Sequence, residues 1–314
     1  MPHDPALDRT WRPAWPCPVP RVLAPLRRGG GDPAYRRDAA GTVWKSFRTP
    51  EGPTTLAVRP LDSLGEVRAR AWGPGADWVL DGLPSLLGAD DDPSDFVAHH
   101  PVLQGPARRF AHWRVCRTRL VMESLVPAIF EQRVTGRESF ATWRRLLRVY
   151  GDPAPGPVGE LGLRVMPSVE VMRSVPSWGW LKLGIDHQRA AALSQVLRAG
   201  AALERLAELP AADADRHLRA FPGVGLWTSA EVRARAFGDA DAISFGDYHV
   251  AKDVTWALTG RPQDDAVMER LLEPYVGHRF RVQVLVGMGG LRRPRRAPRM
   301  TLPTHLPSGV GRWS

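Results

Sequence analysis

The pattern Pro222-Gly223-Val224-Gly225 stands between two stretches with helical periodicity, at 212–221 and 226–237. Two glycines so close together allow the backbone to pass near another surface. The amides that open the second helix have no carbonyl partner within that helix, so they can bind an anion such as a phosphate. A tight turn between two packed helices is the alternative interpretation of the same residues.

An acidic residue follows this hairpin after about twenty residues. Asp247 lies in the segment Ser244–Val250 (SFGDYHV), directly before VAKDVTWAL, which is typical of a helix. A carboxylate at such a place can cap the helix, since aspartate is a preferred N-terminal cap.

Several helices must position these residues. Thr135 and Glu138 form the pattern of a capping box, in which two side chains satisfy free amides at a helix start. Apolar residues then recur every three or four positions up to Tyr150, and Gly-Asp-Pro follows, so a helix ends there. Residues 119–133 predict a largely apolar, buried helix that Pro127 can kink.

A further helix can begin after Asp186, a preferred cap, and run to Glu208. The chain before residue 98 has a different pattern. Apolar and polar residues alternate over 43–48, 54–58 and 66–72, with turn signals between them. This predicts a small antiparallel sheet, with a helix over 76–87 packed on it.

The chain therefore divides into four parts. Residues 1–40 are rich in Pro, Gly and Arg, and we predict a poorly ordered or surface-wrapped lead-in. Residues 41–98 form a small β-rich N-terminal domain. Residues 99–290 form a helical core of two helical subdomains, with the helix, hairpin and helix at 212–237. Residues 291–314 form a basic tail that has no reason to pack.

Charge indicates the class of partner. The 314 residues include 43 Lys and Arg against 33 Asp and Glu, a formal net charge of +10 at pH 7. Such a balance favours an anionic polymer, and nucleic acid becomes the first partner class. With Cys17 and Cys116 as the two cysteines, no disulfide framework, zinc cluster or iron–sulfur ligand set can be built from thiolates. His99-His100 and the acidic run 90–92 lack metal spacing and are better explained as solvated loop.

No stretch approaches the roughly 18 consecutive apolar residues that a membrane helix needs, and the start lacks the features of a signal peptide. We therefore expect a cytoplasmic protein, without contact with a membrane.

These motifs resemble the helix-hairpin-helix DNA glycosylase superfamily, and the order of elements is similar to its AlkA-like branch, the DNA-3-methyladenine glycosylases. The resemblance covers roughly residues 43–290 and is specific at 125–136 and 221–250. It implies an α+β, mostly α-helical fold with a small N-terminal antiparallel sheet. It also implies that Asp247 is the catalytic residue. The DNA-binding residues that it implies at the hairpin are Pro222, Gly223, Val224, Gly225 and Thr228.

The resemblance assigns further residues to the lesion. Gln132 corresponds to a polar residue that faces the opened duplex, and Arg133 to the side chain that fills the gap left by the extruded nucleotide. A surface helix terminus is the alternative for both. Trp227 stands where bifunctional relatives carry the lysine that forms a Schiff base, which an indole cannot do. The resemblance therefore implies a monofunctional enzyme. In the AlkA-like branch a tryptophan at this place borders the base pocket, so Trp227 is a candidate for the substrate pocket, with Tyr248 or Tyr275; an ordinary buried aromatic is the alternative for Trp227.

The sequence departs from the family pattern at Gly246, where the AlkA-like loop usually has a proline or a second acid, and the aromatic-rich C-terminal segment is matched only loosely by 274–280. We expect a monofunctional DNA glycosylase that hydrolyses the N-glycosidic bond of alkylated purines in duplex DNA by base flipping, for base excision repair. The alternatives are a non-catalytic duplex-binding protein and a glycosylase for oxidised or mismatched bases. We expect a nucleoid-associated monomer that uses no metal and no cofactor.

Overall fold

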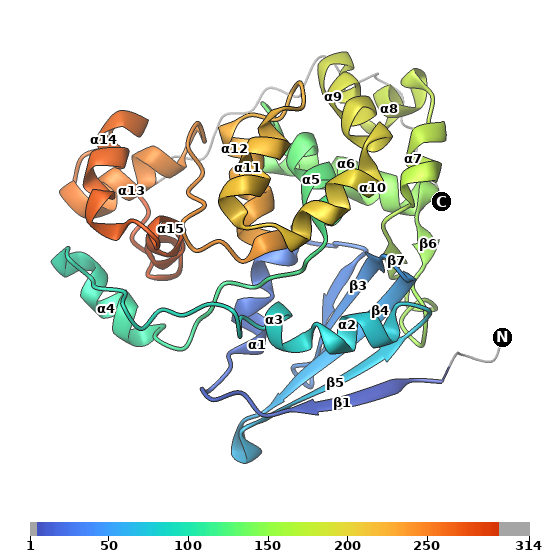
Figure 1. Ribbon diagram of the computed structural model, residues 1–314, viewed down its shortest axis with the longest axis horizontal. Coiled ribbons are helices and arrows are strands. Elements are labelled where there is room, and N and C mark those ends of the chain that lie inside the picture. Colours follow the sequence, from blue (N-terminus) through green and yellow to red (C-terminus); the bar gives the residue numbers. More distant parts are fainter. Residues whose placement is uncertain (1–4, 295–314) are drawn as a thin grey trace.

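A five-stranded antiparallel sheet forms one side of the molecule, with helices packed against it (Figure 1). The computed structural model describes residues 5–294. The strand order across the sheet is β1 (Leu7–Trp11), β5 (Glu66–Trp72), β4 (Gly52–Leu61), β3 (Val43–Thr49) and β2 (Tyr35–Arg37). Strands β3, β4 and β5 confirm the three strands that the alternating pattern predicts.

The alternation of apolar and polar side chains along each strand determines which face of the sheet is buried. Val58 of β4 lies opposite Ala69 of β5, and both are 1% exposed. Their face packs against α1 (Val19–Val22) and α2 (Ala76–Asp81), and α3 (Leu83–Leu86) follows directly on α2. The predicted helix at 76–87 is therefore present as two short helices.

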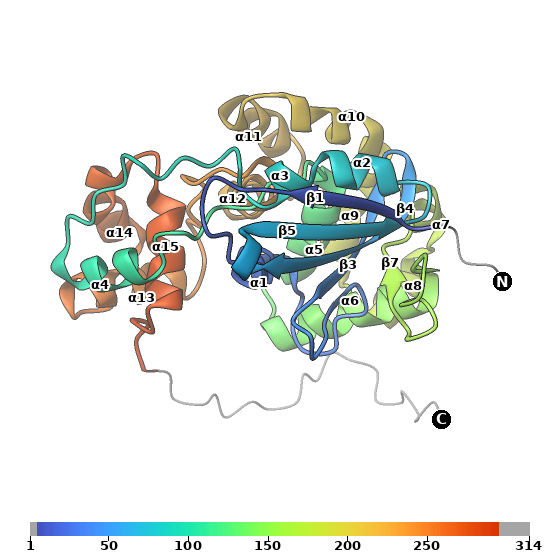
Figure 2. The same cartoon turned by 90° about the horizontal axis from the view of Figure 1, so that it is seen from below.

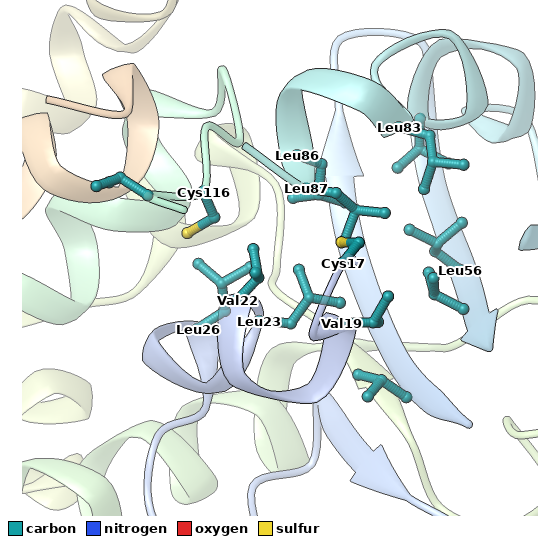
Figure 3. Packing of buried hydrophobic residues seen from close by; sticks show 14 of the residues in the cluster. Cys17, Val19, Val22, Leu23, Leu26, Leu56, Leu83, Leu86, Leu87 and Cys116 are labelled. Atoms are coloured by element: carbon teal, nitrogen blue, oxygen red, sulfur yellow. The ribbon is translucent and has the colours of Figure 1, made fainter. Parts of the chain in front are cut away.

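The prediction of a poorly ordered lead-in is wrong. Strand β1 pairs with β5 along its length, and β2 pairs with β3. Between these strands, apolar side chains of the lead-in pack against α3 and the inner face of the sheet (Figure 3); the labelled members of this cluster are Cys17, Val19, Val22, Leu23, Leu26, Leu56, Leu83, Leu86, Leu87 and Cys116. Proline and arginine concealed this role, because the buried residues are spaced irregularly between them.

The helices after α3 form two groups. The central group consists of α5 (Val121–Glu131), α6 (Gly136–Tyr150), α7 (Val169–Ser174), α8 (Ser177–Leu183), α9 (His187–Arg198), α10 (Gly200–Glu204), α11 (Ala211–Arg219) and α12 (Leu226–Val232), which continues as a π-helical turn at Arg233–Phe237. Strands β6 (Asp152–Pro153) and β7 (Arg164–Val165) form a small hairpin after α6. The second group consists of α4 (Pro101–Arg109), α13 (Val250–Thr259), α14 (Asp265–Leu271) and α15 (Arg279–Met288).

Helix α4 belongs to the second group although it comes early in the chain. It lies beside α13–α15 in both views (Figure 1 and Figure 2), and Leu103 shares an apolar core with Val254 and Val286. Single turns of 3₁₀ helix lie at Ala24–Leu26, Asp62–Leu64, Arg205–Glu208 and Glu273–Tyr275. Among residues 5–294, no helix is long and apolar enough to cross a membrane.

The helix ends confirm the capping predictions. The Thr135 hydroxyl accepts a hydrogen bond from the Glu138 amide, and the Glu138 carboxylate accepts one from the Thr135 amide at 2.9 Å. Asp186 accepts from the Arg189 amide at 2.9 Å and starts α9. The predicted apolar helix is α5, whose residues from Val121 to Phe130 are buried with the exception of Glu123.

The start of the predicted tail is packed, which corrects that prediction. Leu291 lies against the second helical group, and Arg293 Nε is 3.3 Å from Asp253 Oδ1. The remainder of the tail, 295–314, lies outside the described residues, as do residues 1–4.

Candidate active site

The hairpin between α11 and α12 presents its backbone at the surface. Pro222, Gly223 and Gly225 are exposed, while Val224 is 4% exposed and anchors the hairpin in the central core. Gly223 has φ +85°, and a Cβ placed on it would lie 2.6 Å from the Cβ of Ala192 in α9. Glycine is therefore required here both by the backbone conformation and by the close approach of α9.

The first amides of α12 have no acceptor within the helix, because each lies within the first turn after Gly225. Asp215 of α11 fixes the orientation of α12 relative to α11. It accepts a hydrogen bond from Ser229 Oγ at 2.6 Å and lies 3.0 Å from Arg233 Nη1. Burial acts to raise the pKa of Asp215, but the bond from Ser229 and the charges of Arg233 and Arg219 hold it below its ordinary value. The carboxylate is thus ionised, and its bonds hold α11 and the segment from α12 to Arg233 together on either side of the hairpin.

Gln132 connects the end of α5 to this hairpin. Its Nε2 donates to Gly223 O at 2.8 Å and to Thr228 Oγ1 at 2.9 Å. The DNA contacts of Gln132 and Thr228 stay a prediction: the Gln132 amide nitrogen is bonded within the protein, although the residue is partly exposed, and the Thr228 side chain is 2% exposed. The side chain of Val224 is also internal, so this part of the hairpin can contact a phosphate only through its backbone.

Arg133 is exposed at the end of α5 and has φ +55°, a left-handed conformation that is unusual for a residue other than glycine. Such a conformation costs of order 1–3 kcal/mol and is typical of functional loops. Its Nη1 is 3.4 Å from Gln188 Oε1 in α9, a long contact. Since Gln132 binds the hairpin, Arg133 projects from the segment directly beside it.

Asp247 lies at the start of α13 and is half-buried. Its Oδ1 accepts hydrogen bonds from the amides of His249 at 2.7 Å and Val250 at 2.9 Å. Its Oδ2 accepts from Trp227 Nε1 at 3.3 Å. The N-cap residue of α13 is His249, so Asp247 is not the N-cap that its sequence context suggests. Its carboxylate instead holds the amides of the cap residue and of the first helical residue, and it also contacts Trp227.

The loop before Asp247 is held from two sides. Ser244 Oγ donates to Glu231 Oε1 at 2.8 Å, and the Gly246 amide donates to Asp265 Oδ2 at 2.9 Å. Gly246 has φ +82°. Proline cannot adopt this angle, since its ring fixes φ near −65°. The proline that is usual at this position of the AlkA-like pattern would therefore not fit the loop conformation of this protein.

Buried charges support this loop from below, and sequence analysis missed them. Glu231 Oε2 accepts from Arg235 Nη1 at 2.7 Å. Burial acts to raise the pKa of Glu231, but the Arg235 charge, the Ser244 bond and the Arg28 charge keep it low. Arg28, which is 6% exposed, pairs with Glu131 of α5 at 2.7 Å. The spacing of Glu231 and Arg235 is a detectable helical signal, but Arg28 belongs to the segment that we predicted to be a lead-in.

The two tyrosines predicted to line the pocket differ in environment. Tyr248 is 74% exposed, and Lys252 Nζ lies 4.1 Å from the centroid of its ring. Tyr275 is 2% exposed in the core of the second helical group, and its hydroxyl accepts a hydrogen bond from the His100 amide at 2.9 Å. Its ring has no free face for a base, so the prediction for Tyr275 is wrong.

Asp247 and Trp227 are thus in contact, and the exposed Tyr248 follows Asp247 in the chain. Gln132, Gly223 and Thr228 form a second contact set at the hairpin. Within residues 5–294, no group of three His, Cys, Asp or Glu side chains is placed to hold a metal ion. The chemistry that these groups can perform is that of one carboxylate beside aromatic rings.

Comparison with known proteins gives one relative by sequence and several by structure. No family profile matches the chain. A stretch of 173 residues, 52% of the chain, is 30% identical to a probable bifunctional transcriptional activator/DNA repair enzyme AlkA of Mycobacterium tuberculosis. The match covers 33% of that protein, so the chain spans about a third of the length of this curated relative.

Two solved structures match nearly the whole chain. One is a 3-methyladenine DNA glycosylase from Archaeoglobus fulgidus, with a TM-score of 0.69 and 17% identity over 88% of this chain and 96% of that one. The other is an 8-oxoguanine glycosylase/lyase from Clostridium acetobutylicum in complex with double-stranded DNA, with a TM-score of 0.66 and 12% identity over 91% and 97%. Together with the hairpin geometry, these matches establish that the chain has the α+β fold of the helix-hairpin-helix DNA glycosylases.

Proposed function

We propose that this protein is a monofunctional DNA glycosylase that removes alkylated purines from duplex DNA. The observation that carries the proposal is the position of Asp247, whose carboxylate is held at the start of α13 by two amides and by the indole of Trp227. Oδ1 is thus taken up by the backbone, while Oδ2 faces the indole of the residue that stands where bifunctional relatives carry their lysine.

The exposed hairpin supports binding of DNA. Gly223 and Gly225 leave its surface free of side chains, and the first amides of α12 can hold a phosphate without contacting a base. Arg133 is exposed at the adjoining end of α5, and its side chain would occupy the space of an extruded nucleotide. Extrusion costs a few kcal/mol, and damaged base pairs lower that cost.

Asp247 then acts on the sugar. Cleavage of an N-glycosidic bond builds positive charge on the sugar, as in glycoside hydrolysis, and a nearby carboxylate stabilises that charge. The same carboxylate can orient or deprotonate the attacking water. An alkylated purine that already carries a positive charge leaves without protonation, so one carboxylate is sufficient for such a substrate.

The monofunctional assignment rests on Trp227. An indole nitrogen cannot form an imine with the sugar, and here it donates a hydrogen bond to the Asp247 carboxylate. Lys252 is the nearby amine, and its Nζ lies over the Tyr248 ring. The preference for alkylated purines rests on the exposed ring of Tyr248 and the ring of Trp227. Each aromatic face favours a cationic base by about 0.5–2 kcal/mol.

Replacement of Asp247 by Asn tests the assignment. The side-chain oxygen of Asn can accept the same two amide bonds as Asp247 Oδ1, so D247N retains the start of α13 but loses the charge. We expect the release of 7-methylguanine from duplex DNA to fall by about 100-fold or more, while binding to DNA with an abasic site persists. Asp264→Asn is the matched control, because Asp264 caps α14 by a similar bond to Val267 and should leave excision unchanged. Wild-type excision rates in D247N would rule the mechanism out.

Two other functions give different results in the same assay. A non-catalytic duplex-binding protein would bind DNA but release no base from any substrate. A glycosylase for oxidised bases is favoured by the likeness to the 8-oxoguanine glycosylase/lyase fold, and it would release 8-oxoguanine faster than 7-methylguanine. Matched duplexes carrying each lesion separate these possibilities.

A further inference from the structure

A cavity of about 420 Å³ lies apart from the residues of the candidate active site. It is formed by the segment before β2, by β2 itself, by the last turn of α6 and by the loop between β6 and β7. Arg27, Arg36, Arg37 and Arg148 contribute to its lining, and the remaining lining includes Tyr35 and the apolar side chain of Leu161. The volume lies within the roughly 300–1,000 Å³ that is typical of small-molecule sites.

The positive charge of this cavity is not neutralised from within. None of its four arginines forms an ion pair with a carboxylate among residues 5–294, and all four are exposed. Asp32 is the acidic residue of the lining, but it is 5% exposed. Its oxygens accept hydrogen bonds from the Arg28 and Ala34 amides and from the Trp143 indole.

Four unpaired guanidinium groups that converge on one cavity repel one another. Tyr35, which is 9% exposed, lines the same cavity. Burial raises the pKa of the Tyr35 hydroxyl, and the charges of Arg27 and Arg37 oppose that effect. An anion in the cavity would remove this repulsion.

The walls are held in place before any ligand binds. The Arg164 amide donates to Pro33 O at 2.7 Å, and the Ser46 amide donates to Ala34 O at 3.0 Å. Ser46 Oγ donates to Arg164 O at 2.6 Å, which joins β3 to β7. Strand β2 is paired with β3 from Tyr35 onward. A preformed cavity binds its ligand without the entropic cost of ordering its walls.

We propose that this cavity binds a phosphate-bearing ligand of nucleotide size. Guanidinium groups bind phosphate through paired, charge-assisted hydrogen bonds. Tyr35, Pro33 and Leu161 offer an apolar surface for the organic part of the ligand. The same phosphate chemistry can come from a free nucleotide or from the backbone of DNA, and the two sources are separable by experiment.

Calorimetric titration of the full chain with inorganic pyrophosphate at low salt tests the proposal. We expect saturable binding of one pyrophosphate per chain, and we expect Arg36→Gln with Arg148→Gln to weaken it by about tenfold or more. The matched control removes the same net charge from β4 and β5. Arg59 and Arg68 lie opposite each other there, are exposed, lie outside the cavity and form no ion pair within the described part of the chain. The double variant Arg59→Gln with Arg68→Gln should bind as the wild type does.

Three results decide the outcome. Absence of saturable binding by the wild type, or equal weakening by the control variant, would overturn the site. The four replaced arginines are exposed, so we expect both double variants to unfold at a temperature close to that of the wild type, and this result excludes a folding defect. Competition by a short undamaged duplex separates the sources of phosphate. If the cavity variant also binds the duplex more weakly than the wild type, the ligand is the DNA backbone. If duplex binding is unchanged in this variant, the ligand is a free phosphate compound.

Discussion

Glu204 allows a prediction of stability against pH. It is the last residue of α10, and its carboxylate accepts hydrogen bonds from the amides of Val121 at 2.8 Å and Met122 at 2.9 Å, at the start of α5. Burial raises the pKa of Glu204 to about 7, the two amide bonds act against this, and the charge of Glu123 adds to it. The folded protein therefore holds a proton that the unfolded chain releases near its ordinary pKa of 4.5.

Because folding raises the pKa of Glu204, the contribution of this group to the free energy of unfolding decreases as the pH rises. The stabilisation that Glu204 provides is complete below pH 4.5 and is lost as the pH rises through 7. One pKa unit corresponds to about 1.4 kcal/mol, so the free energy of unfolding should fall by about 2–3 kcal/mol between pH 5 and pH 8 through this group alone. Glu204→Gln cannot ionise and should lack that fall, although it loses one amide bond at every pH.

Urea unfolding of the wild type and E204Q at pH 5, 6, 7 and 8 measures this effect. The difference in free energy of unfolding between the two proteins should shift by about 2–3 kcal/mol in favour of E204Q as the pH rises. Glu208→Gln is the control, because Glu208 is exposed in the following turn. The free energy of unfolding of this variant should change with pH as that of the wild type does. A difference between the wild type and E204Q that does not change with pH would refute the reasoning.

Three further predictions follow from the geometry. Gly223→Ala should lower the free energy of unfolding by about 1–3 kcal/mol, measured by urea titration, because its Cβ would meet Ala192 in a left-handed turn; an unchanged midpoint would show that the hairpin can shift freely. Borohydride should trap no covalent adduct between the protein and DNA, since Trp227 replaces the lysine of bifunctional relatives. Trapping that disappears in Lys252→Gln would instead assign lyase chemistry to that amine. Burial raises the pKa of Cys17 to about 12 and that of Cys116 to about 11, so both thiols should resist iodoacetamide at pH 8 until urea unfolds the chain; mass spectrometry would detect any earlier labelling.

The sequence alone was sufficient for features that depend on neighbouring residues. Alternation predicted strands β3, β4 and β5, and the Thr135 and Glu138 capping box predicted the start of α6. The two glycines indicated a turn that can approach an anion, because this follows from local backbone geometry, whereas the role predicted for Asp247 came from the family resemblance. Each of these signals lies within a few consecutive residues, where periodicity and capping preferences act directly.

Tertiary structure decided where distant residues meet. It buried Tyr275 against His100 of another segment, and it directed Gln132 at the hairpin and not outward. It also placed Arg28, from a segment with no visible period, in the charged network beneath the active-site loop. Burial of a polar or aromatic side chain depends on which segments pack around it, and those contacts join residues about a hundred or more positions apart. Local pattern determined the elements, whereas packing between distant segments determined which side chains are exposed.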